Sequence, residues 1–172
     1  MSNQQERLHG NNNNFATPTN FICGSSKLNL VQVYCQSINI PGISLNHAYL
    51  GTGFGTPTNV SGDNIIYNPL SITLAVDENF ESYFEFMTKL NQNVHPNSGS
   101  FADIEFDFFI SVNNTKGNEI FKIDFSECRV SSISDIMLNT TEDETMLTVQ
   151  IDLLYDYYTI TKNGNTIPIL RT

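Results

Sequence analysis

Three acidic residues near the middle of the chain have a spacing at which a β-strand could carry out chemistry. Asp103, Glu105 and Asp107 alternate with apolar residues, so on one strand they would share a face, about 6 to 7 Å apart. Carboxylates at such distances can bind a divalent cation or act as a general acid and base. However, the histidines are scattered along the chain and no second motif supplies a nucleophile. A solvated strand face is the favoured interpretation, and we expect no catalytic or metal site.

A glycine-rich stretch raises the question of a phosphate-binding loop. Gly51, Gly53 and Gly55 lie in LGTGFGTPTNVSGD, but Thr56 stands where the dinucleotide pattern needs its third glycine, and Pro57 follows. The Gly-Lys-Ser/Thr pattern of the other phosphate loop is absent from the sequence. We therefore expect neither a nucleotide nor any other cofactor. Residues 50–63 are interpreted as a long, mobile, backbone-exposed loop, and a loop of this length needs a role of its own.

The cysteines and tyrosines are weaker candidates. The spacing of Cys23, Cys35 and Cys128 fits no zinc motif and includes no CxxC pair, so we expect buried, inert, reduced thiols. A catalytic pair of Cys35 with His47 is disfavoured because Cys35 lies in a strand-like apolar stretch. The tyrosines near the C-terminus could stack on bases or sugars, but core packing explains them as well. The residues predict no enzyme.

The charge of the chain limits its partners. The chain contains eight Lys and Arg residues and eighteen Asp and Glu residues, which gives a net charge of −10. Such a surface repels phosphates, so specific binding of nucleic acid is disfavoured. Charged residues make up only 15% of the chain, where about 25% is usual, and Asn, Ser and Thr take their place. Either an AT-rich genome or a surface that is buried against neighbouring subunits would explain this, and both explanations stay open.

The sequence contains no membrane or export signal that we recognise. No run of eighteen apolar residues occurs, so no insertion into a membrane is expected. The N-terminal stretch MSNQQERLHGNNNN lacks the apolar segment of a signal peptide. We therefore expect the chain to fold in a cytoplasm.

The first half of the chain predicts an arm, several strands and one helix. Residues 1–20 are interpreted as an extended or weakly ordered arm. β-Branched and aromatic residues predict strands at 20–23, 27–38 and 70–76. A helix should follow, with Asp77 as its N-cap and its end near residue 93. We expect its aromatic face to pack onto a sheet and to comprise Phe80, Tyr83, Phe84, Met87 and Leu90.

The second half predicts antiparallel strands. Alternation predicts strands at 101–112 and 119–125 joined by a hairpin turn, then a bulged strand or a change of direction. One long strand, 145–160, should place both Tyr155 and Tyr157 on its apolar face, before a turn at Asn163 and Gly164. The predicted fold is mainly β: an antiparallel sandwich or barrel-like domain over 21–160 with a single packed helix, and a tail at 161–172.

Long strands with exposed edges invite pairing with another chain. If several subunits closed their sheets into one large barrel, the acidic strand faces would line a channel. DNA could pass through such a channel without adhering, because like charge prevents phosphate contacts. The candidates for this lining are Asp103, Glu105, Asp107, Asp152 and Asp156.

The order of these elements resembles that of one known family. INIPGI precedes the glycine-rich loop with VSGD, and PLSITLAVDENFESYFEFMTKL runs from a strand into an aromatic-faced helix. CRVSSISDIMLNTTEDETMLTVQIDLLYDYY then supplies the closing strands. Over residues 20–158 this pattern is similar to the tail tube protein family of contractile-tailed bacteriophages.

The resemblance implies a structural virion protein without a catalytic site or cofactor. Such proteins form hexameric rings that stack into a hollow tail tube inside a contractile sheath, and the tube conducts DNA during ejection. The partners would be further copies of the chain, the sheath and the baseplate, in a virion tail assembled in the host cytoplasm. The early loop would contact the adjacent ring through Leu50, Gly51, Gly53, Phe54, Gly55, Asn59, Gly62 and Asp63.

The same features are compatible with alternative roles. The N-terminal arm and the C-terminal tail also suit a baseplate tube-initiator or a tube terminator on the same fold. Tube proteins of type VI secretion and of phage-derived contractile injection systems share the architecture. From another class, a monomeric β-sandwich binding module could use its glycine-rich loop to hold a small ligand, and a carboxylate hydrolase is a more distant possibility.

Overall fold

A computed structural model describes residues 19–50, 55, 58–94, 104–140 and 146–168 of the chain. Antiparallel strands dominate these residues, and two helices accompany them. In chain order the elements are β1 (Phe21–Ser25), α1 (Val31–Tyr34), β2 (Cys35–Asn39), β3 (Ile43–Leu50), β4 (Thr58–Tyr67), β5 (Leu70–Ala75), α2 (Glu81–Val94), β6 (Phe106–Asn113), β7 (Glu119–Ile133), β8 (Thr148–Leu154), β9 (Tyr157–Lys162) and β10 (Asn165–Pro168). The predicted mainly β, antiparallel fold with one main helix is confirmed.

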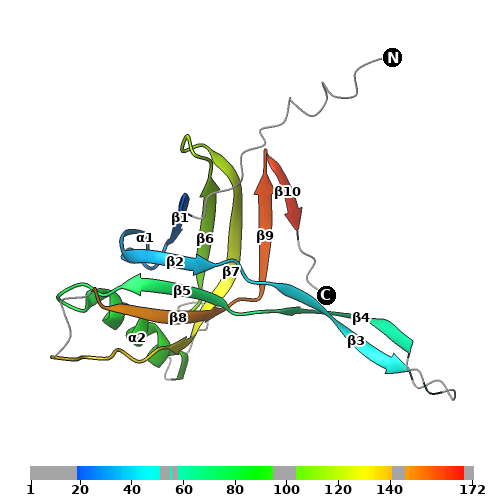
Figure 1. The fold of residues 1–172 in the computed structure, drawn as a ribbon, viewed down its shortest axis with the longest axis horizontal. Helices are drawn as coiled ribbons and strands as arrows, with labels where there is room; N and C mark the ends of the chain where they lie inside the picture. The colour runs from blue at the N-terminus through cyan, green and yellow to red at the C-terminus, as the bar shows by residue number, and fades with distance from the viewer. Residues whose placement is uncertain (1–18, 51–54, 56–57, 95–103, 141–145, 169–172) are drawn as a thin grey trace, which may run out of the picture.

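The strands form two layers that share β7. The first layer, which we call the wall sheet, has the order β1-β6-β7-β9-β10. The second, which we call the cross sheet, continues from the far half of β7 through β8 and β5 to β2. The wall sheet stands upright in Figure 1, and the cross sheet runs across its base. The two layers enclose the core between them.

The shared strand β7 changes sheets at a bulge. Phe125 lies opposite Phe108, whereas Cys128 lies opposite Phe106, so β7 has an extra residue between these pairs. Within that interval Glu127 has a positive φ of 57°. A bulge adds twist and bends its strand, which turns the second half of β7 away from β9 and toward β8. The predicted change of direction in this stretch is thereby confirmed.

Alternating apolar residues build the core. Ile104, Phe106, Phe108 and Ile110 are buried on the inner side of the wall sheet, as the alternation predicts. On β7 and on the cross sheet, other alternating side chains meet them in one cluster; its buried members there include Ile123, Phe125, Cys128, Val130, Leu70, Ile72, Leu74, Val149, Ile151 and Leu153. Because one face of each sheet is apolar, a shift of register by one residue would move this entire set to the solvent face.

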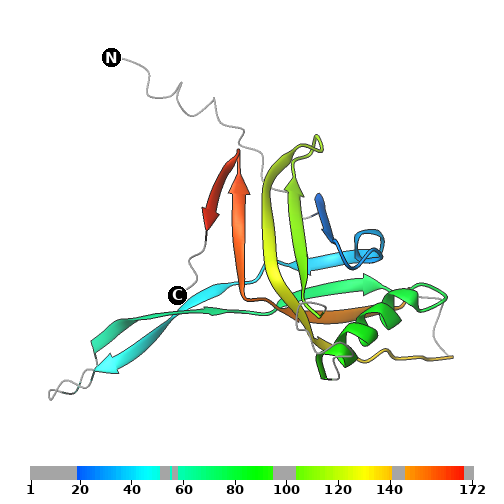
Figure 2. The same cartoon turned by 180° about the vertical axis from the view of Figure 1, so that it is seen from behind.

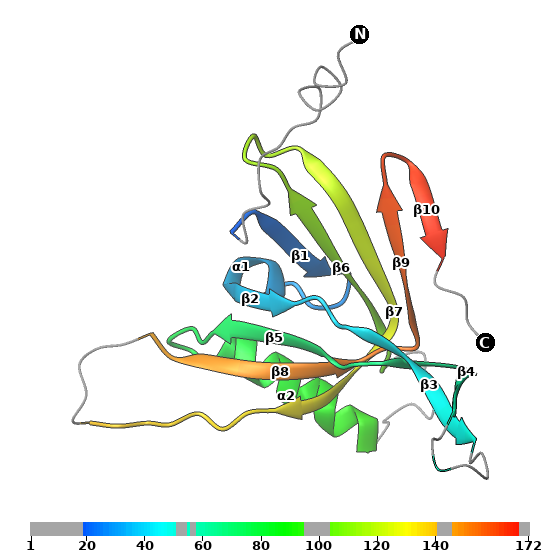
Figure 3. The same cartoon turned by 45° about the vertical axis from the view of Figure 1, so that its right-hand side comes forward.

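Helix α2 forms where the sequence predicts it but packs through a different face. The Asp77 carboxylate accepts hydrogen bonds from the backbone N–H groups of Glu81 (3.2 Å) and Ser82 (3.0 Å). It therefore caps the helix, although α2 begins at Glu81 and not directly after Asp77 as predicted. Phe86 is fully buried, whereas Phe84 is 61% exposed, so the predicted inward face was wrong at Phe84. Met87 is also exposed. Figure 3 shows α2 alongside the second half of β7, where the Asn93 side chain donates to the Val130 carbonyl at 2.8 Å.

Two predicted strands are interrupted. The strand expected over 27–38 is confined to β2, because Val31–Tyr34 form a helical turn that buries Val31. The long strand over 145–160 divides into β8 and β9 at residues 155–156. At this break the backbone N–H of Asp156 donates to the Ser126 carbonyl, which turns the chain from the cross sheet into the wall sheet. Consequently Tyr155 and Tyr158 are buried, and the prediction of Tyr157 in the core was wrong.

The glycine-rich stretch is not the long loop that we expected. β3 and β4 pair with each other over Ile43–Leu50 and Thr58–Tyr67, so 58–63 is strand. The two strands form a sheet of their own. They project from the body as an arm in Figures 1 and 2. The expectation of a loop failed because Asn, Ser and Gly disfavour strands as isolated residues, yet the pairing of β4 with the β-branched and apolar residues of β3 satisfies their backbone groups.

The predicted hairpin turns are confirmed. Asn114 accepts hydrogen bonds from the backbone N–H groups of Lys116 and Asn118 through its side chain, which closes the turn between β6 and β7. Asn163 and Gly164 both have positive φ, 51° and 78°, as a two-residue turn of the Asn-Gly type requires. The resulting β9–β10 hairpin spans the predicted start of the C-terminal tail at residue 161.

Candidate assembly surfaces

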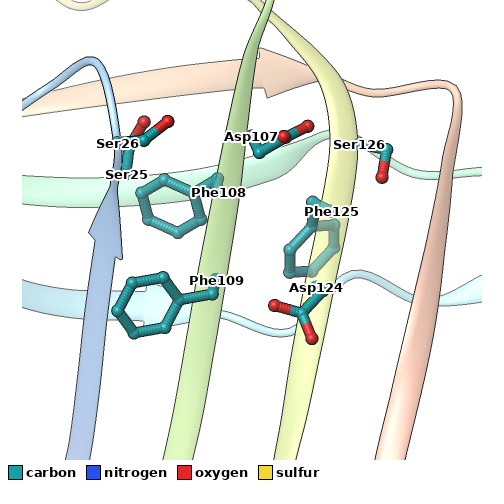
Figure 4. Close-up of a pocket in the computed structure, with 8 residues that line it drawn as sticks. All are labelled: Ser25, Ser26, Asp107, Phe108, Phe109, Asp124, Phe125 and Ser126. Carbon is teal, nitrogen blue, oxygen red and sulfur yellow. The ribbon is translucent and has the colours of Figure 1, made fainter. Parts of the chain in front are cut away.

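The predicted carboxylate ladder does not form as one row. Asp107 lies on β6 and is exposed on the outer face of the wall sheet, whereas Glu105 precedes the strand. Asp103 lies outside the described residues. Figure 4 shows Asp107 and Asp124 among the side chains that line one pocket, together with Ser25, Ser26, Ser126 and the rings of three phenylalanines. Asp124 was not among the predicted lining residues, although its alternation with the buried residues of β7 would have placed it on this face.

Glu105 and Asp156 are brought together by one arginine. The Arg129 guanidinium lies 2.7 Å from the Asp156 carboxylate and 3.4 Å from the Glu105 carboxylate. Arg129 comes from β7 just beyond the bulge, and Asp156 comes from the break between β8 and β9. This charge cluster therefore joins the point at which β7 passes from one sheet to the other and the point at which the chain passes from β8 to β9. Its geometry indicates a structural role at the junction of the two sheets.

Asp152 belongs to the other sheet. Its carboxylate accepts hydrogen bonds from the hydroxyls of Ser71 (2.6 Å) on β5 and Ser132 (2.8 Å) on β7, and from the Gln150 side chain (3.4 Å). The bond from Ser71 is the largest of the effects that lower the pKa of Asp152 below its usual range, and those from Ser132 and Gln150 add to it. The carboxylate thus links three strands of the cross sheet and does not share a face with Asp107.

The outer face of the wall sheet carries both signs of charge. Lys122 and Asp124 alternate with the buried residues of β7 and form an ion pair at 2.7 Å. The Lys122 ammonium also lies 5.1 Å from the centre of the Phe109 ring, in cation–π geometry. Threonines at 159 and 161 oppose these residues on β9. The face is therefore polar, with its acidic groups partly neutralised.

Within the part of the chain that the structure describes, the wall sheet is open at both edges. Among the described residues, no strand pairs with the outer side of β1 or of β10. The backbone N–H of Asn113 donates to the Asn20 carbonyl, so in antiparallel pairing the alternate residues Phe21, Cys23 and Ser25 direct their backbone groups toward the free edge. Unpaired N–H and C=O groups in a row are a template for pairing with another chain.

The β3–β4 arm exposes large apolar side chains. Ile43, Leu45, Val60 and Ile66 are each between 41% and 57% exposed. The register places Leu45 and Ile66 on opposite faces of the hairpin. An isolated two-stranded hairpin is marginally stable in water, and large apolar groups exposed on both of its faces indicate surfaces for contact. Sequence reasoning missed these four residues: Val60 lay in the stretch 50–63 that was interpreted as a loop, and the other three were assigned to no strand.

The predicted contact residues on this arm are distributed along it. Leu50 ends β3, and Asn59, Gly62 and Asp63 lie on β4. Gly62 is required sterically, since a Cβ there would lie 2.3 Å from the carbonyl oxygen of Asn46. Gly55 is exposed and has a φ of 87°. The other predicted contact residues, Gly51, Gly53 and Phe54, lie outside the described residues.

Helix α2 presents a second apolar stripe to the outside. Phe84, Met87 and Val94 recur at intervals of three and seven residues and are all exposed. A groove along the helix is lined by Met87, Thr88, Leu90, Asn91 and Val94. Within the described residues, no group of three His, Cys, Asp or Glu is placed to hold a metal ion. In the same part of the chain no helix has the length and hydropathy needed to cross a membrane.

Comparisons with known proteins identify the fold. No protein-family model matches the chain, and no curated protein matches it by sequence. Solved structures do match. A chain of the anti-feeding prophage (AFP) baseplate has a TM-score of 0.65 at 11% identity, covering 87% of this chain and 97% of that chain. A chain of the AFP tube-terminating cap has a TM-score of 0.62 at 18% identity, covering 87% and 92%.

A third match comes from a different injection system. A chain of the sheath–tube complex of an extracellular contractile injection system, PVC, in its extended state has a TM-score of 0.62 at 16% identity, covering 94% of this chain and 99% of that chain. At these identities the likeness concerns the fold alone. The fold of this chain is that of tube, cap and baseplate proteins of contractile systems, so the resemblance to the tail tube family is confirmed at the level of the fold.

Proposed function

We propose that this chain is a non-enzymatic structural subunit of the tube of a contractile bacteriophage tail. Its copies form hexameric rings that stack, with the wall sheets lining a channel through which DNA passes during ejection. The protein works inside a virion tail, assembled in the host cytoplasm, with the sheath and the baseplate as further partners. The fold shared with tube, cap and baseplate chains of contractile injection systems supports this proposal.

The observation that carries the proposal is that, over the described ranges, the wall sheet is open at both edges and the β3–β4 arm forms a separate sheet. Lateral pairing of wall sheets between subunits would satisfy the free backbone groups of β1. Contact of the β3–β4 arm with the next ring would bury Leu45 and Val60, which are exposed in the single chain. The proposed inter-ring contact keeps the predicted residues, namely Leu50, Gly51, Gly53, Phe54, Gly55, Asn59, Gly62 and Asp63.

Charge sets a requirement on such a ring. Six chains of −10 sum to −60, so the contacts between subunits must be largely uncharged. The apolar arm and the free backbone edges meet this requirement. Asp107 and Asp124 on the outer face of the wall sheet would face the lumen and discourage adhesion of DNA. Because salt screens repulsion between like charges, we expect added salt to promote assembly.

Two roles within the same class are alternatives. Matches to a tube-terminating cap and to a baseplate chain score as well as the match to a sheath–tube complex. A terminator or a baseplate tube-initiator would form the ring but would not extend it from both faces. Growth of the assembly with concentration separates these roles: a tube subunit adds rings, whereas a terminal ring stays single.

Sedimentation velocity on the purified full-length chain tests the proposal. Across a concentration series in low and high salt, we expect a species of about 116 kDa, six times 19.3 kDa, and multiples of it. Replacing Leu45 and Val60 on the arm with Ser should retain the ring and abolish its multiples. Replacing Ser131, exposed at the far end of β7, with Ala serves as the control. Assembly that weakens steadily with salt, or stacking that survives the arm substitutions, would contradict this account of the contacts.

A further inference from the structure

Two of the three cysteines meet where the strand path begins and ends. Cys23 lies in β1 and is buried, and Cys35 is the first residue of β2 and is half-buried. β1 and β2 are the two ends of the six-strand path β1-β6-β7-β8-β5-β2, and they do not pair with each other. Both thiols line one pocket at this corner, together with Gln32 and Gln36. The pocket opens the pair to small reagents from solution.

The two thiols lie within reach of each other. The Cys35 thiol donates to the Ser37 carbonyl at 3.6 Å. A side-chain interaction of hydrogen-bond type between Cys23 and Cys35 is the largest effect on the pKa of each. This interaction favours the thiolate of Cys35 and lowers its pKa, although partial burial opposes the effect. The same interaction, followed by burial, raises the pKa of Cys23. Cys23 is only 2% exposed, whereas Cys35 is half-buried, so Cys35 is the more accessible sulfur and Cys23 lies beside it as a resolving thiol.

We propose that Cys23 and Cys35 form a thiol–disulfide site that closes the corner between the wall sheet and the cross sheet. The oxidant is a low-molecular-weight disulfide such as oxidised glutathione. Cys35 loses its proton to solvent and attacks one glutathione sulfur, which forms a mixed disulfide and releases a glutathione thiolate. Cys23 then attacks the Cys35 sulfur, and the second glutathione leaves with the proton of the Cys23 thiol. In total, two protein thiols are oxidised and one glutathione disulfide is reduced to two glutathione molecules.

The bond would join two strands, β1 and β2, that do not pair with each other. It closes a loop from residue 23 to residue 35 that contains helix α1 and ties both ends of the strand path into a ring. A cross-link that closes a loop of this size restricts the unfolded chain and thereby stabilises the folded one. We expect the melting temperature of the oxidised protein to rise by about 5 °C or more. This consequence does not depend on the proposed role in a tube.

Cys128 provides an internal control. It is fully buried in the core beneath the bulge of β7, opposite Phe106. Burial raises the pKa of its thiol to about 12, with a further contribution from the Asp107 charge. Its sulfur therefore has neither the access nor the thiolate character for exchange, and it should stay reduced while the other two react.

Thiol counting on the full-length protein tests the proposal. The protein is equilibrated with mixtures of reduced and oxidised glutathione, quenched with acid, unfolded and alkylated, and its intact mass is measured. We expect two of the three thiols to disappear together with the loss of two hydrogens, and peptide mapping to give a Cys23–Cys35 disulfide. The C128S variant should behave like the unmodified protein, whereas C35S should form no internal disulfide.

Other results would overturn the proposal. Three alkylated thiols at every glutathione ratio would show that the pair does not exchange. A glutathione adduct that persists on Cys35, or a disulfide that includes Cys128, would show that Cys23 does not act as the resolving thiol. Each of these results is measured on the protein without substitutions, so none depends on whether a variant folds.

Discussion

Alanine substitutions of two phenylalanines on α2 should have very different effects on the free energy of unfolding, because one ring is in the core and the other is on the surface. Phe86 has no exposed surface and is among the largest fully buried side chains, whereas Phe84 is 61% exposed. Truncating a buried phenylalanine to alanine removes its transfer free energy and leaves a cavity, which together cost about 3 to 5 kcal/mol. The F84A variant removes a mostly solvated ring, so its effect should stay within about 1 kcal/mol.

The magnitude is large relative to the stability of the fold. Domains of this kind unfold with about 5 to 15 kcal/mol, so F86A could remove a third or more of the total. For a chain of this length each kcal/mol shifts the melting temperature by about 2 to 4 °C, which gives a loss of at least 6 °C. Both substitutions delete the same ring from the same helix, so differences in helix propensity cancel.

Urea unfolding provides the assay. Circular dichroism reports the strands, and tyrosine fluorescence reports the aromatic core, since the chain has no tryptophan. The midpoint should fall for F86A with little change in slope, and it should stay near that of the unmodified protein for F84A. Equal losses in the two variants, or a larger loss for F84A, would refute the packing of α2 described above.

Three further predictions concern single side chains. Replacing Arg129 with Met removes two ion pairs but keeps the apolar stem, so it should cost about 1 to 2 kcal/mol in urea unfolding and less in high salt; K116M, in the exposed β6–β7 turn, should cost nothing measurable. Burial raises the pKa of Glu85 above its usual value of 4.5, and weaker hydrogen bonds from backbone N–H groups oppose this shift. One oxygen of the Glu85 carboxylate is buried without a hydrogen-bond partner. The charged form therefore destabilises the fold at neutral pH, so E85Q should unfold at higher urea, and its advantage should vanish as the pH falls through the raised pKa toward 4.5; an advantage that persists in acid would contradict this. The G62A variant places a Cβ against the Asn46 carbonyl, so hydrogen exchange should rise in β3 and β4 alone, whereas S61A should leave it unchanged.

Local patterns predicted the strands of the wall sheet well. At Ile104–Ile110 and at Phe121–Phe125, apolar and polar residues alternate because only one face of the strand is buried. This alternation is visible in the local sequence. The Asn163–Gly164 turn and the Asp77 cap likewise depend on contacts within a few residues. Such features could therefore be predicted without knowledge of the rest of the fold.

Features decided by distant parts of the chain could not be predicted. Helix α2 carries two apolar stripes, and only the position of β7 determines that Phe86 is buried and Phe84 is not. The break at Tyr155 and Asp156 depends on Ser126 and Arg129, which lie on another strand. Among the candidate lining residues, Asp152 and Asp107 both occupy polar positions on strands, but the two strands belong to different sheets. No local sequence pattern reveals to which sheet a strand belongs.

Electron microscopy of the purified full-length protein tests the central claim most directly. In negative stain over a concentration series, at low and at high salt, the proposed tube subunit should appear as hollow six-fold rings that stack into tubes as concentration rises. Particles of single-chain size at every concentration and salt level, or assemblies without a central channel, would contradict the account of the wall sheet as the lining of a tube.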